Sequence, residues 1–238
     1  AMAQSTVTLY GLVDVGYNHV TGLKGGSYNG IASGIMEGSR WGLKGNKDLG
    51  GGSKAIYTFE SRFEADTGSV TNRPPSGTQL PDRVGATALA NLPAYIPGPV
   101  AAGTVAAINN AIGTNAFGVN LAGNLFDRQA YAGLITPFGA ITLGRQYTSI
   151  FDALVLITPL AYSGAYEPFS PLLGNLRNDN SVKYRFNANG VSAQLHYAFG
   201  EQAASKSANA AWGGFVTYAK SGLNATVVVD QQNGADVN

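Results

Sequence analysis

The 238-residue sequence predicts an all-β protein whose strands form an antiparallel barrel within a membrane. Strand-sized segments, among them 55–63 and 141–147, alternate with period 2, which places apolar side chains on one face and polar ones on the other. Only 12% of residues are charged, against roughly 25% in an ordinary soluble domain. Because the chain has no apolar run of about 18 residues, we expect the membrane to be crossed by strands and not by helices.

Nine strands are expected along the chain. In the first, 6–18, the apolar side chains of Val7 and Leu9 alternate with those of Thr8 and Tyr10. A Gly- and Ser-rich stretch, 21–34, separates it from the second strand. The remaining strands follow the same alternation, and the nine are 6–18, 37–48, 54–66, 126–136, 140–147, 180–187, 191–199, 210–220 and 223–232.

Short turns join several of these strands in pairs. Leu49–Ser53 is rich in glycine, and Pro137–Gly139 carries the Pro and Gly of a tight turn. Asn189-Gly190 is a two-residue hairpin signal, and Ser221-Gly222 has a similar composition. Short turns alternating with long connections are typical of an outer-membrane barrel, whose tight turns face the periplasm and whose long loops lie outside.

Two connections are too long to be plain turns. Residues 67–125 are rich in Ala, Gly, Pro and Asn, and we interpret them as a large extracellular loop, with a small inserted subdomain as the alternative. A short helix over 101–112 is compatible with either. Residues 148–178 carry many Leu, Ile, Tyr, Pro and Phe side chains, so we expect this segment to fold inward and pack against the barrel wall.

Six stretches resemble the general porins of Gram-negative outer membranes, of the β-proteobacterial type. They recur in the order of that family from residue 4 to about 200; the resemblance is thinner beyond it and absent over most of 69–124. The stretches are QSTVTLYG (4–11), SRWGLKG (39–45), DLGGG (48–52), DRQAYAGL (127–134), LGRQY (143–147) and NSVKY (180–184).

The resemblance implies a single porin barrel domain over 1–238, of the 16-stranded antiparallel kind, in the bacterial outer membrane. It also implies a homotrimer embedded in outer-membrane lipid, which passes small hydrophilic solutes and ions by diffusion. In the family, the third long loop folds into the lumen and narrows it. No cofactor and no nucleic-acid partner is implied, and the net charge of +1 adds no argument for nucleic acid.

The pore of this family narrows between a ladder of wall arginines and carboxylates on the inward loop. Arg40, Arg128 and Arg145 match the ladder positions, and Arg62 is in phase with its neighbours on the third strand. On the inward loop, Asp152 follows the fifth strand and Glu167 lies in the YEPF sequence of the expected tip. The predicted constriction is therefore Arg40, Arg62, Arg128, Arg145, Asp152 and Glu167.

Further polar residues are expected to line the pore, because their positions alternate with apolar ones. Val182, Tyr184 and Leu195 take the lipid phase, so the positions between them take the lumen phase. The predicted lining is Lys44, Glu60, Glu64, Lys183, Arg185 and His196, together with Gln194. Counted over the constriction and the lining together, basic residues exceed acidic ones, which favours a mild anion preference. Candidates for the interfacial aromatic girdles or trimer contacts are Tyr10, Trp41, Tyr131, Tyr184, Tyr197 and Phe199.

Three other classes of protein give different expectations for this sequence. An enzyme is not expected, because the chain has two histidines and no cysteines, and no serine lies in a Gly-x-Ser-x-Gly elbow; no catalytic or metal site is predicted. A soluble or surface-exposed β-protein that binds a partner would carry unusually few charges on its exposed face. The main alternative is a substrate-specific outer-membrane channel, for an organic acid or a sugar.

Length argues that the sequence is the N-terminal part of a longer porin. Nine strands leave about seven of the implied 16 unaccounted for, and nine is an odd number. The expected barrel is therefore truncated at the C-terminus. At the other end, Ala1–Ala3 followed by Gln4 is similar to the end of a secretory signal, with Gln4 as the first mature residue.

Overall fold

The computed structural model describes residues 5–23, 26–70, 124–158, 176–203 and 205–234. Nine of the strands in these ranges form one sheet, and two others, β2 (Val15–Leu23) and β3 (Gly26–Ser33), form a separate hairpin. One helix, α3 (Ser149–Ile157), accompanies them. The strands of the main sheet are β1 (Ser5–Leu12), β4 (Arg40–Gly50), β5 (Ser53–Arg62), β6 (Gln129–Thr136), β7 (Gly139–Tyr147), β8 (Arg177–Ala188), β9 (Val191–Ala198), β10 (Ala211–Lys220) and β11 (Leu223–Gln232).

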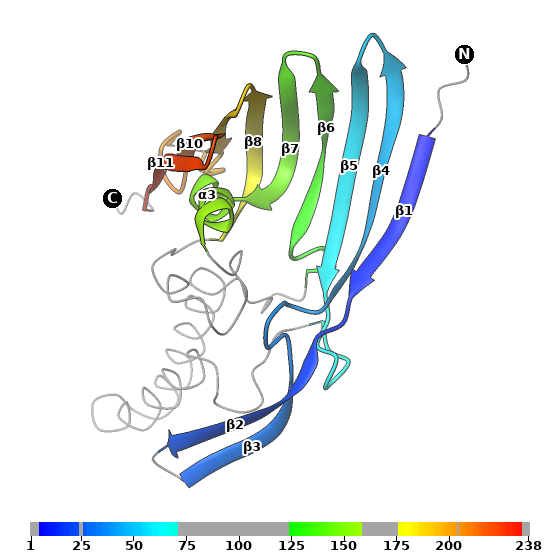
Figure 1. The fold of residues 1–238 in the computed structure, drawn as a ribbon, viewed down its shortest axis with the longest axis vertical. Helices are drawn as coiled ribbons and strands as arrows, with labels where there is room; N and C mark the ends of the chain where they lie inside the picture. The colour runs from blue at the N-terminus through cyan, green and yellow to red at the C-terminus, as the bar shows by residue number, and fades with distance from the viewer. Residues whose placement is uncertain (1–4, 24–25, 71–123, 159–175, 204, 235–238) are drawn as a thin grey trace.

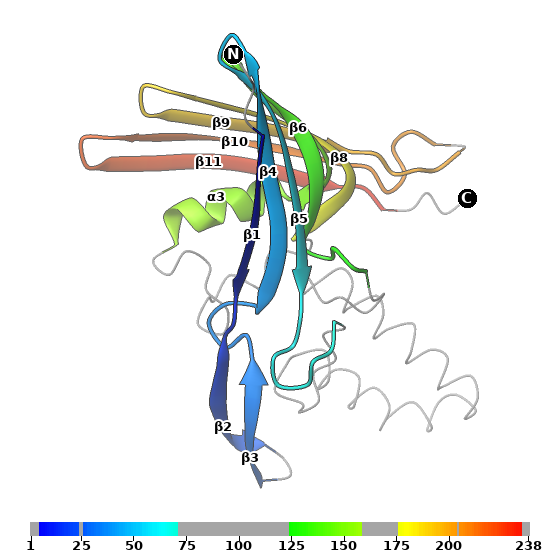
Figure 2. The same cartoon turned by 90° about the vertical axis from the view of Figure 1, so that its right-hand side faces the viewer.

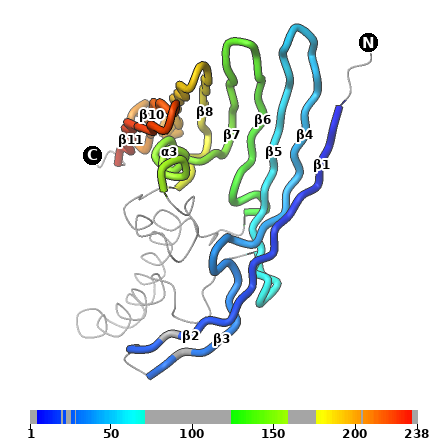
Figure 3. Tube along the Cα trace, viewed as in Figure 1, coloured from blue at the N-terminus to red at the C-terminus, as the bar shows by residue number. Residues whose placement is uncertain are grey.

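The main sheet is an antiparallel meander in which each strand pairs with its neighbours in the order β1-β4-β5-β6-β7-β8-β9-β10-β11. Figure 1 shows it as a strongly bent wall, with β1 at one edge and β11 at the other. The trace in Figure 3 runs from one edge to the other without crossing over itself within the sheet. The predicted fold class, antiparallel β, is confirmed, although the sheet is not closed over the described residues.

The two faces of the wall differ in chemistry, as the alternation predicted. The face that carries α3, called the inner face, buries polar side chains such as Glu60, Lys183 and Gln194. The opposite, outer face exposes Leu9, Leu195 and similar side chains. A soluble sheet would bury the apolar set. Polar residues inside and apolar residues outside are the arrangement of a barrel wall that meets lipid.

The first predicted strand, 6–18, is wrong as a single element. The strand in the main sheet, β1, ends at Leu12. The chain continues as β2, which pairs with β3 in a hairpin that projects away from the wall (Figures 1 and 2). The break lies at Asp14, whose carboxylate accepts hydrogen bonds from the backbone N–H groups of Met36 (2.8 Å) and Glu37 (2.7 Å). These two bonds tie the bend to the segment that leads back into β4.

The Gly- and Ser-rich stretch 21–34 contains a strand that its composition did not indicate. β3 pairs with β2 from Val15 opposite Ser33 to Leu23 opposite Gly26. Backbone hydrogen bonds to the partner strand hold this segment extended, so it needs no apolar alternation of its own. The described residues therefore form eleven strands instead of the nine expected.

The predicted two-residue hairpin turns are confirmed by their backbone angles. Asn189 and Gly190 have φ of 51° and 84°, and Ser221 and Gly222 have 55° and 84°. Positive φ at both central residues is the geometry whose twist suits adjacent antiparallel strands. These turns fix the registers of β8 with β9 and of β10 with β11.

Part of the predicted inward segment, 148–178, is α3. The Thr148 side chain caps the helix by accepting a hydrogen bond from the backbone N–H of Phe151 (3.4 Å). The helix packs against β9, β10 and β11 on the inner face (Figure 2). No helix among the described residues is long and apolar enough to cross a membrane. Glu167 and the possible helix over 101–112 lie outside the described residues.

Candidate functional site

Charged side chains gather on the inner face in two groups. The first, called the Glu60 cluster, lies where β1, β4 and β5 adjoin the segment before β6. The second, called the Asp152 cluster, lies between α3 and strands β8 and β9. The Glu60 cluster comprises Tyr10, Glu37, Arg40, Glu60, Arg62, Asp127, Arg128, Tyr147 and Arg177; the Asp152 cluster comprises Ser149, Asp152, Lys183, Arg185, Gln194 and His196.

Glu60 is the centre of the first cluster, because two hydrogen-bond donors and one further guanidinium lie around its carboxylate. Tyr10 and Glu60 both lie opposite Gly42, so they share the inner face. The Tyr10 hydroxyl donates to Oε2 (2.9 Å), and the Arg128 Nε donates to Oε1 (2.6 Å). Arg40 places its Nε 3.9 Å from Oε2. Both members of the Glu60–Arg128 pair are nearly buried, with side chains 7% and 9% exposed.

Gly42 provides the space for the Tyr10 ring. A Cβ at this position would lie 2.7 Å from the ring carbon Cζ and from the hydroxyl of Tyr10, closer than side chains approach each other. The ring therefore lies against the wall where another residue would project. Lys44, two residues further along β4, holds its ammonium 5.1 Å from the centre of the same ring.

Arg62 and Arg177 extend the cluster beyond Glu60. Asp127 accepts a hydrogen bond from the backbone N–H of Arg62 (2.8 Å), and its other oxygen lies 4.0 Å from the Arg62 guanidinium. Arg177 lies over the ring of Tyr147, at 4.7 Å from the ring centre, and donates to its hydroxyl (3.3 Å). Arg128 donates to the same hydroxyl (2.8 Å). One phenol oxygen thus joins two arginines.

Arginines exceed carboxylates in the Glu60 cluster. The guanidinium groups of Arg40, Arg62, Arg128 and Arg177 face three carboxylates, those of Glu60, Asp127 and Glu37, of which Glu37 binds Arg40 (2.8 Å). Lys44 and Glu64, which lie beside the cluster, add one charge of each sign and leave the excess unchanged. Arg62 Nε is buried with no hydrogen-bond partner in the described structure. An excess of cations on an inner wall favours the passage or binding of anions.

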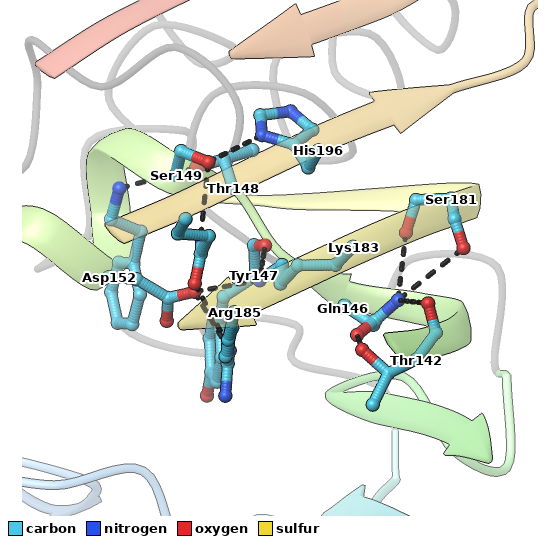
Figure 4. Close-up of polar contacts among 12 residues, drawn as sticks. Thr142, Gln146, Tyr147, Thr148, Ser149, Asp152, Ser181, Lys183, Arg185 and His196 are labelled. Atoms are coloured by element: carbon cyan, nitrogen blue, oxygen red, sulfur yellow. Dashed lines mark hydrogen bonds and ion pairs between the residues drawn. The ribbon is translucent and has the colours of Figure 1, made fainter. Parts of the chain in front are cut away.

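The Asp152 cluster attaches α3 to the wall. The Asp152 carboxylate accepts hydrogen bonds from Lys183 (2.7 Å), Arg185 (3.0 Å) and Gln194 (3.0 Å), which Figure 4 shows in part. The Lys183 side chain is 0% exposed and also donates to the backbone oxygen of Tyr147 (2.5 Å). Tyr147 therefore contacts both clusters, with its hydroxyl in one and its backbone in the other.

Two carboxyl groups outside the strands have shifted pKa values. Burial acts to raise the pKa of Asp152, but Lys183 and then Arg185 outweigh it and hold that pKa below its ordinary value. Burial raises the pKa of Glu64, and Arg62 opposes that shift only partly. Asp152 is thus stabilised as an anion, whereas Glu64 is more easily protonated than a free glutamate.

A buried serine–histidine contact lies beside α3, and sequence reasoning missed it. The Ser149 hydroxyl is 2.6 Å from His196 Nδ1, as Figure 4 shows, and Asn178 is 3.1 Å from the other ring nitrogen. A nucleophilic serine needs an adjacent base but also access to a substrate. Ser149 is fully buried and its oxygen accepts a further hydrogen bond from Gln194 (3.0 Å). The contact therefore fixes the start of α3 on β9.

Arg145 lies apart from the carboxylate that holds Arg128. Its guanidinium donates to the backbone oxygen of Asp127 (2.6 Å) and to Asp179 (2.6 Å), whose side chain is 62% exposed. The register of β7 with β8 shifts between Gly144 and Gln146, and Gly144 has a φ of 129°. Arg145 pairs with Ala130 of β6 at this irregularity, so strict alternation does not decide which way its side chain points.

The other predicted residues are distributed between the two clusters. Arg40, Arg62 and Arg128 lie in the first, and Asp152, Lys183, Arg185 and His196 in the second, while Lys44 and Glu64 lie beside the first. Tyr10 and Tyr131 lie on the inner face and not in an aromatic girdle. The Tyr10 hydroxyl donates to Glu60, and the Tyr131 hydroxyl accepts a hydrogen bond from Thr58 (3.2 Å). Tyr184, Tyr197 and Phe199 are exposed, as a girdle requires.

Arg177, Tyr147 and Asp127 were not predicted as site residues. The weak signal for them was their position: each lies at or next to the end of a strand that borders a long connection. Among the residues that the structure describes, no group of three or more His, Cys, Asp or Glu side chains could hold a metal ion.

Comparison with known proteins gives consistent matches. A sequence model of the Gram-negative porin family matches residues 1–237. Outer membrane porin protein 32 of Delftia acidovorans is 27% identical over 250 aligned residues, covering 99% of this chain and 56% of the relative. An outer membrane porin protein of Bordetella pertussis is 41% identical over 83 residues, covering 29% of this chain and 22% of the relative.

The fold has a solved counterpart. The anion-selective porin from Comamonas acidovorans superposes with a TM-score of 0.66 at 24% identity, covering 98% of this chain and 59% of that one. At this identity the likeness concerns the fold alone. The chain spans just over half the length of this porin and of the Delftia relative.

Proposed function

We propose, from the premise that this chain belongs to the Gram-negative porin family of the outer membrane, that it forms the wall of a diffusion pore. The solutes are small, hydrophilic molecules and ions, and the pore mildly prefers anions. The observation that carries this proposal is the Glu60 cluster, where four arginines outnumber three carboxylates on the inner face.

The arginine excess supports anion preference by a simple electrostatic argument. A carboxylate that is bound by Arg128 and Tyr10 attracts few external cations, because its charge is already compensated. The additional guanidinium groups leave a net positive potential over a wet inner surface, and rings of basic residues favour anions. The Comamonas acidovorans porin with the same fold is described as anion-selective, which agrees with this direction.

The narrowest part of the pore, in this proposal, lies between the wall arginines and the segment that begins with α3. Arg40, Arg62 and Arg128 contribute the cationic side, and Asp152 and Glu167 contribute the acidic side. Arg145 flanks them, since its guanidinium is held by Asp179. Lys44, Glu60, Glu64, Lys183, Arg185 and His196 line the pore around this point.

The chemistry of the outer face supports a membrane environment for the wall. Its exposed leucines, valines and aromatic residues suit contact with lipid. Assembly as a homotrimer is proposed with the porin family and would cover part of this face between neighbouring copies. The long segment within 67–125 is proposed as an extracellular loop.

The test is the reversal potential of protein purified from outer membranes, measured across a planar bilayer under a potassium chloride gradient. We expect an anion-signed potential that moves toward zero, or beyond it, in Arg128→Gln, because the substitution removes a cation and uncovers the Glu60 carboxylate. A cation-signed potential in the wild type would contradict the anion preference. Absence of conductance from folded protein would reject the diffusion pore.

Lys220→Gln is the matched control, because Lys220 is an exposed cation at the end of β10 and lies next to a turn. It removes the same charge as Arg128→Gln and should leave the reversal potential nearly unchanged. If conductance saturates with one organic acid or one sugar, a substrate-specific channel replaces the general pore.

A further inference from the structure

A small cleft lies between α3 and the wall, away from the Glu60 cluster. Its volume is about 280 Å³, close to the lower limit of typical small-molecule pockets. It is lined by α3 on one side and by β8, β9 and β10 on the other, and Asn187 and Ser192 place it toward the tight turn between β8 and β9. The cleft is thus on the inner face but separate from the proposed constriction.

The lining of the cleft is divided into an apolar and a charged part. Val155 and Leu156 of α3 face Phe215 of β10 across it. Arg185, Gln194 and Asp152 form the polar part. A binding site with an apolar body and a few convergent polar groups is the usual form of a small-ligand pocket.

Arg185 retains hydrogen-bonding capacity toward the cleft. Its Nε donates to Gln194 (2.8 Å) and its Nη2 to Asp152 (3.0 Å), while its Nη1 has no acceptor within the described parts of the chain. The side chain is 43% exposed, so a ligand can reach it. Guanidinium groups bind carboxylates through two parallel hydrogen bonds.

The charge of Asp152 does not cancel that of Arg185. Lys183 lies beneath the cleft and donates to the same Asp152 carboxylate (2.7 Å). Two cations therefore share the Asp152 carboxylate. A second carboxylate, Asp230, also interacts with Lys183, but it accepts from the backbone N–H of Ile150 at the start of α3 (3.3 Å) and does not line the cleft, so Arg185 is the cation that a ligand meets there.

We propose that this cleft binds a small carboxylate with an apolar body, such as an aromatic or branched-chain acid. The carboxylate would meet the free edge of Arg185, and the apolar body would lie between Leu156 and Phe215. The volume limits the ligand to about the size of a benzoate. This site does not depend on the conductance of the proposed pore, and its binding is measured without a bilayer.

The experiment is a fluorine NMR titration of the purified protein in detergent with para-fluorobenzoate. We expect saturable binding in the wild type. Para-fluorobenzyl alcohol lacks the charge and fluoroacetate lacks the ring, so each should bind at least about tenfold more weakly, since each loses one half of the recognition. Equal binding of fluoroacetate and para-fluorobenzoate would overturn the cleft, because charge alone would then explain the signal.

Two variants test the site from opposite sides. Arg185→Gln should weaken para-fluorobenzoate binding at least about tenfold by removing the charge-assisted bonds. Leu156→Trp should weaken it similarly by filling the cleft, with every charged residue kept. Circular dichroism verifies that each variant is folded. If Arg185→Gln does not fold, Leu156→Trp decides the question alone.

Lys54→Gln is the charge-matched control, because Lys54 is an exposed cation of β5 that belongs neither to the cleft nor to the proposed pore lining. It removes one cation outside the cleft, so binding should stay within about twofold of the wild type, a change that corresponds to a few tenths of a kcal/mol. An equal loss in Lys54→Gln and Arg185→Gln would refute the site in favour of diffuse attraction. Unchanged binding in Leu156→Trp would also refute it, as would absence of saturable binding in the wild type.

Discussion

The Glu60 and Asp152 clusters use the same chemistry for different connections. In each, one carboxylate lies near two basic side chains and accepts a hydrogen bond from one uncharged group, Tyr10 or Gln194. The Glu60 carboxylate joins residues of the wall to one another. The Asp152 carboxylate belongs to α3, so it joins the inward segment to the wall.

This difference indicates what each cluster controls. Loss of a wall-to-wall contact changes the stability and the charge of the sheet itself. Loss of a helix-to-wall contact leaves the sheet paired, because no strand hydrogen bond depends on it. It changes the position of α3, which begins the segment that enters the pore in the proposed function. The four predictions below test this distinction.

The largest effect is expected for Glu60→Ala. It leaves Arg128 nearly buried without its carboxylate, and breaking such a pair costs about 3–5 kcal/mol of unfolding free energy. Denaturant titration in detergent measures it. Glu37→Ala is the control: Glu37 is 38% exposed and also binds an arginine, so its loss should cost at most about 1 kcal/mol. Equal losses in the two variants would contradict the importance of burial.

A smaller and more local effect is expected for Asp152→Asn. The amide keeps one acceptor but leaves the fully buried Lys183 without its counter-ion, at a cost of about 2 kcal/mol. Hydrogen exchange should accelerate at the amides of α3, with little change in β4 and β5. Acceleration spread evenly over the sheet would show that the contact supports the wall and not the helix.

Acid should reproduce this release in the wild type. The pKa of Asp152 is depressed in the folded protein, so its contribution to stability is present above the ordinary aspartate pKa and is lost as pH falls through the depressed value. Hydrogen exchange of α3, compared between about pH 5 and pH 2 after correction for intrinsic rates, should rise in the wild type. In Asp152→Asn, exchange corrected in the same way should depend little on pH, because the titrating carboxyl group is absent. An identical pH dependence in both proteins would show that another group causes it.

The smallest effect is expected for Arg145→Gln. Its partner Asp179 is 62% exposed, and ion pairs of this kind contribute about 0–1 kcal/mol. The reversal potential should also change less than in Arg128→Gln, because no buried carboxylate is uncovered. A shift equal to that of Arg128→Gln would support the sequence prediction that Arg145 belongs to the constriction, and a smaller shift would support a flanking position.

Sequence alternation predicted the faces of the wall well where strands are regular. Lys183 and Gln194 lie on the inner face and Tyr184 and Leu195 on the outer face, because an uninterrupted strand has only two phases. The hairpin turns were predictable for a similar reason, since Asn189-Gly190 accepts the positive φ that the turn requires.

The sequence did not predict the positions where strands end, bend or shift in register. Asp14 ends β1 through bonds to Met36 and Glu37, more than 20 residues away in the chain, which no local pattern reveals. Alternation alone would group Arg145 with the exposed Ile141 and Leu143, and the register shift between Gly144 and Gln146 changes that phase in a way that the sequence does not reveal. The contact between Arg177 and Tyr147 depends on how β8 enters the sheet after a long connection. It could therefore not be predicted from the sequence.

Gly42 has a consequence for how such a wall diversifies. Its missing side chain is what allows the Tyr10 phenol to lie flat between β1 and β5. Alanine or valine can replace any glycine codon through one nucleotide change. The added Cβ would lie 2.7 Å from the Phe59 backbone oxygen as well as from the ring, so it would strain the wall and displace the ring from Glu60. If the proposed pore is correct, a single mutation at this position would change its width and its charge together, so natural variation at Gly42 would tune permeability in one step.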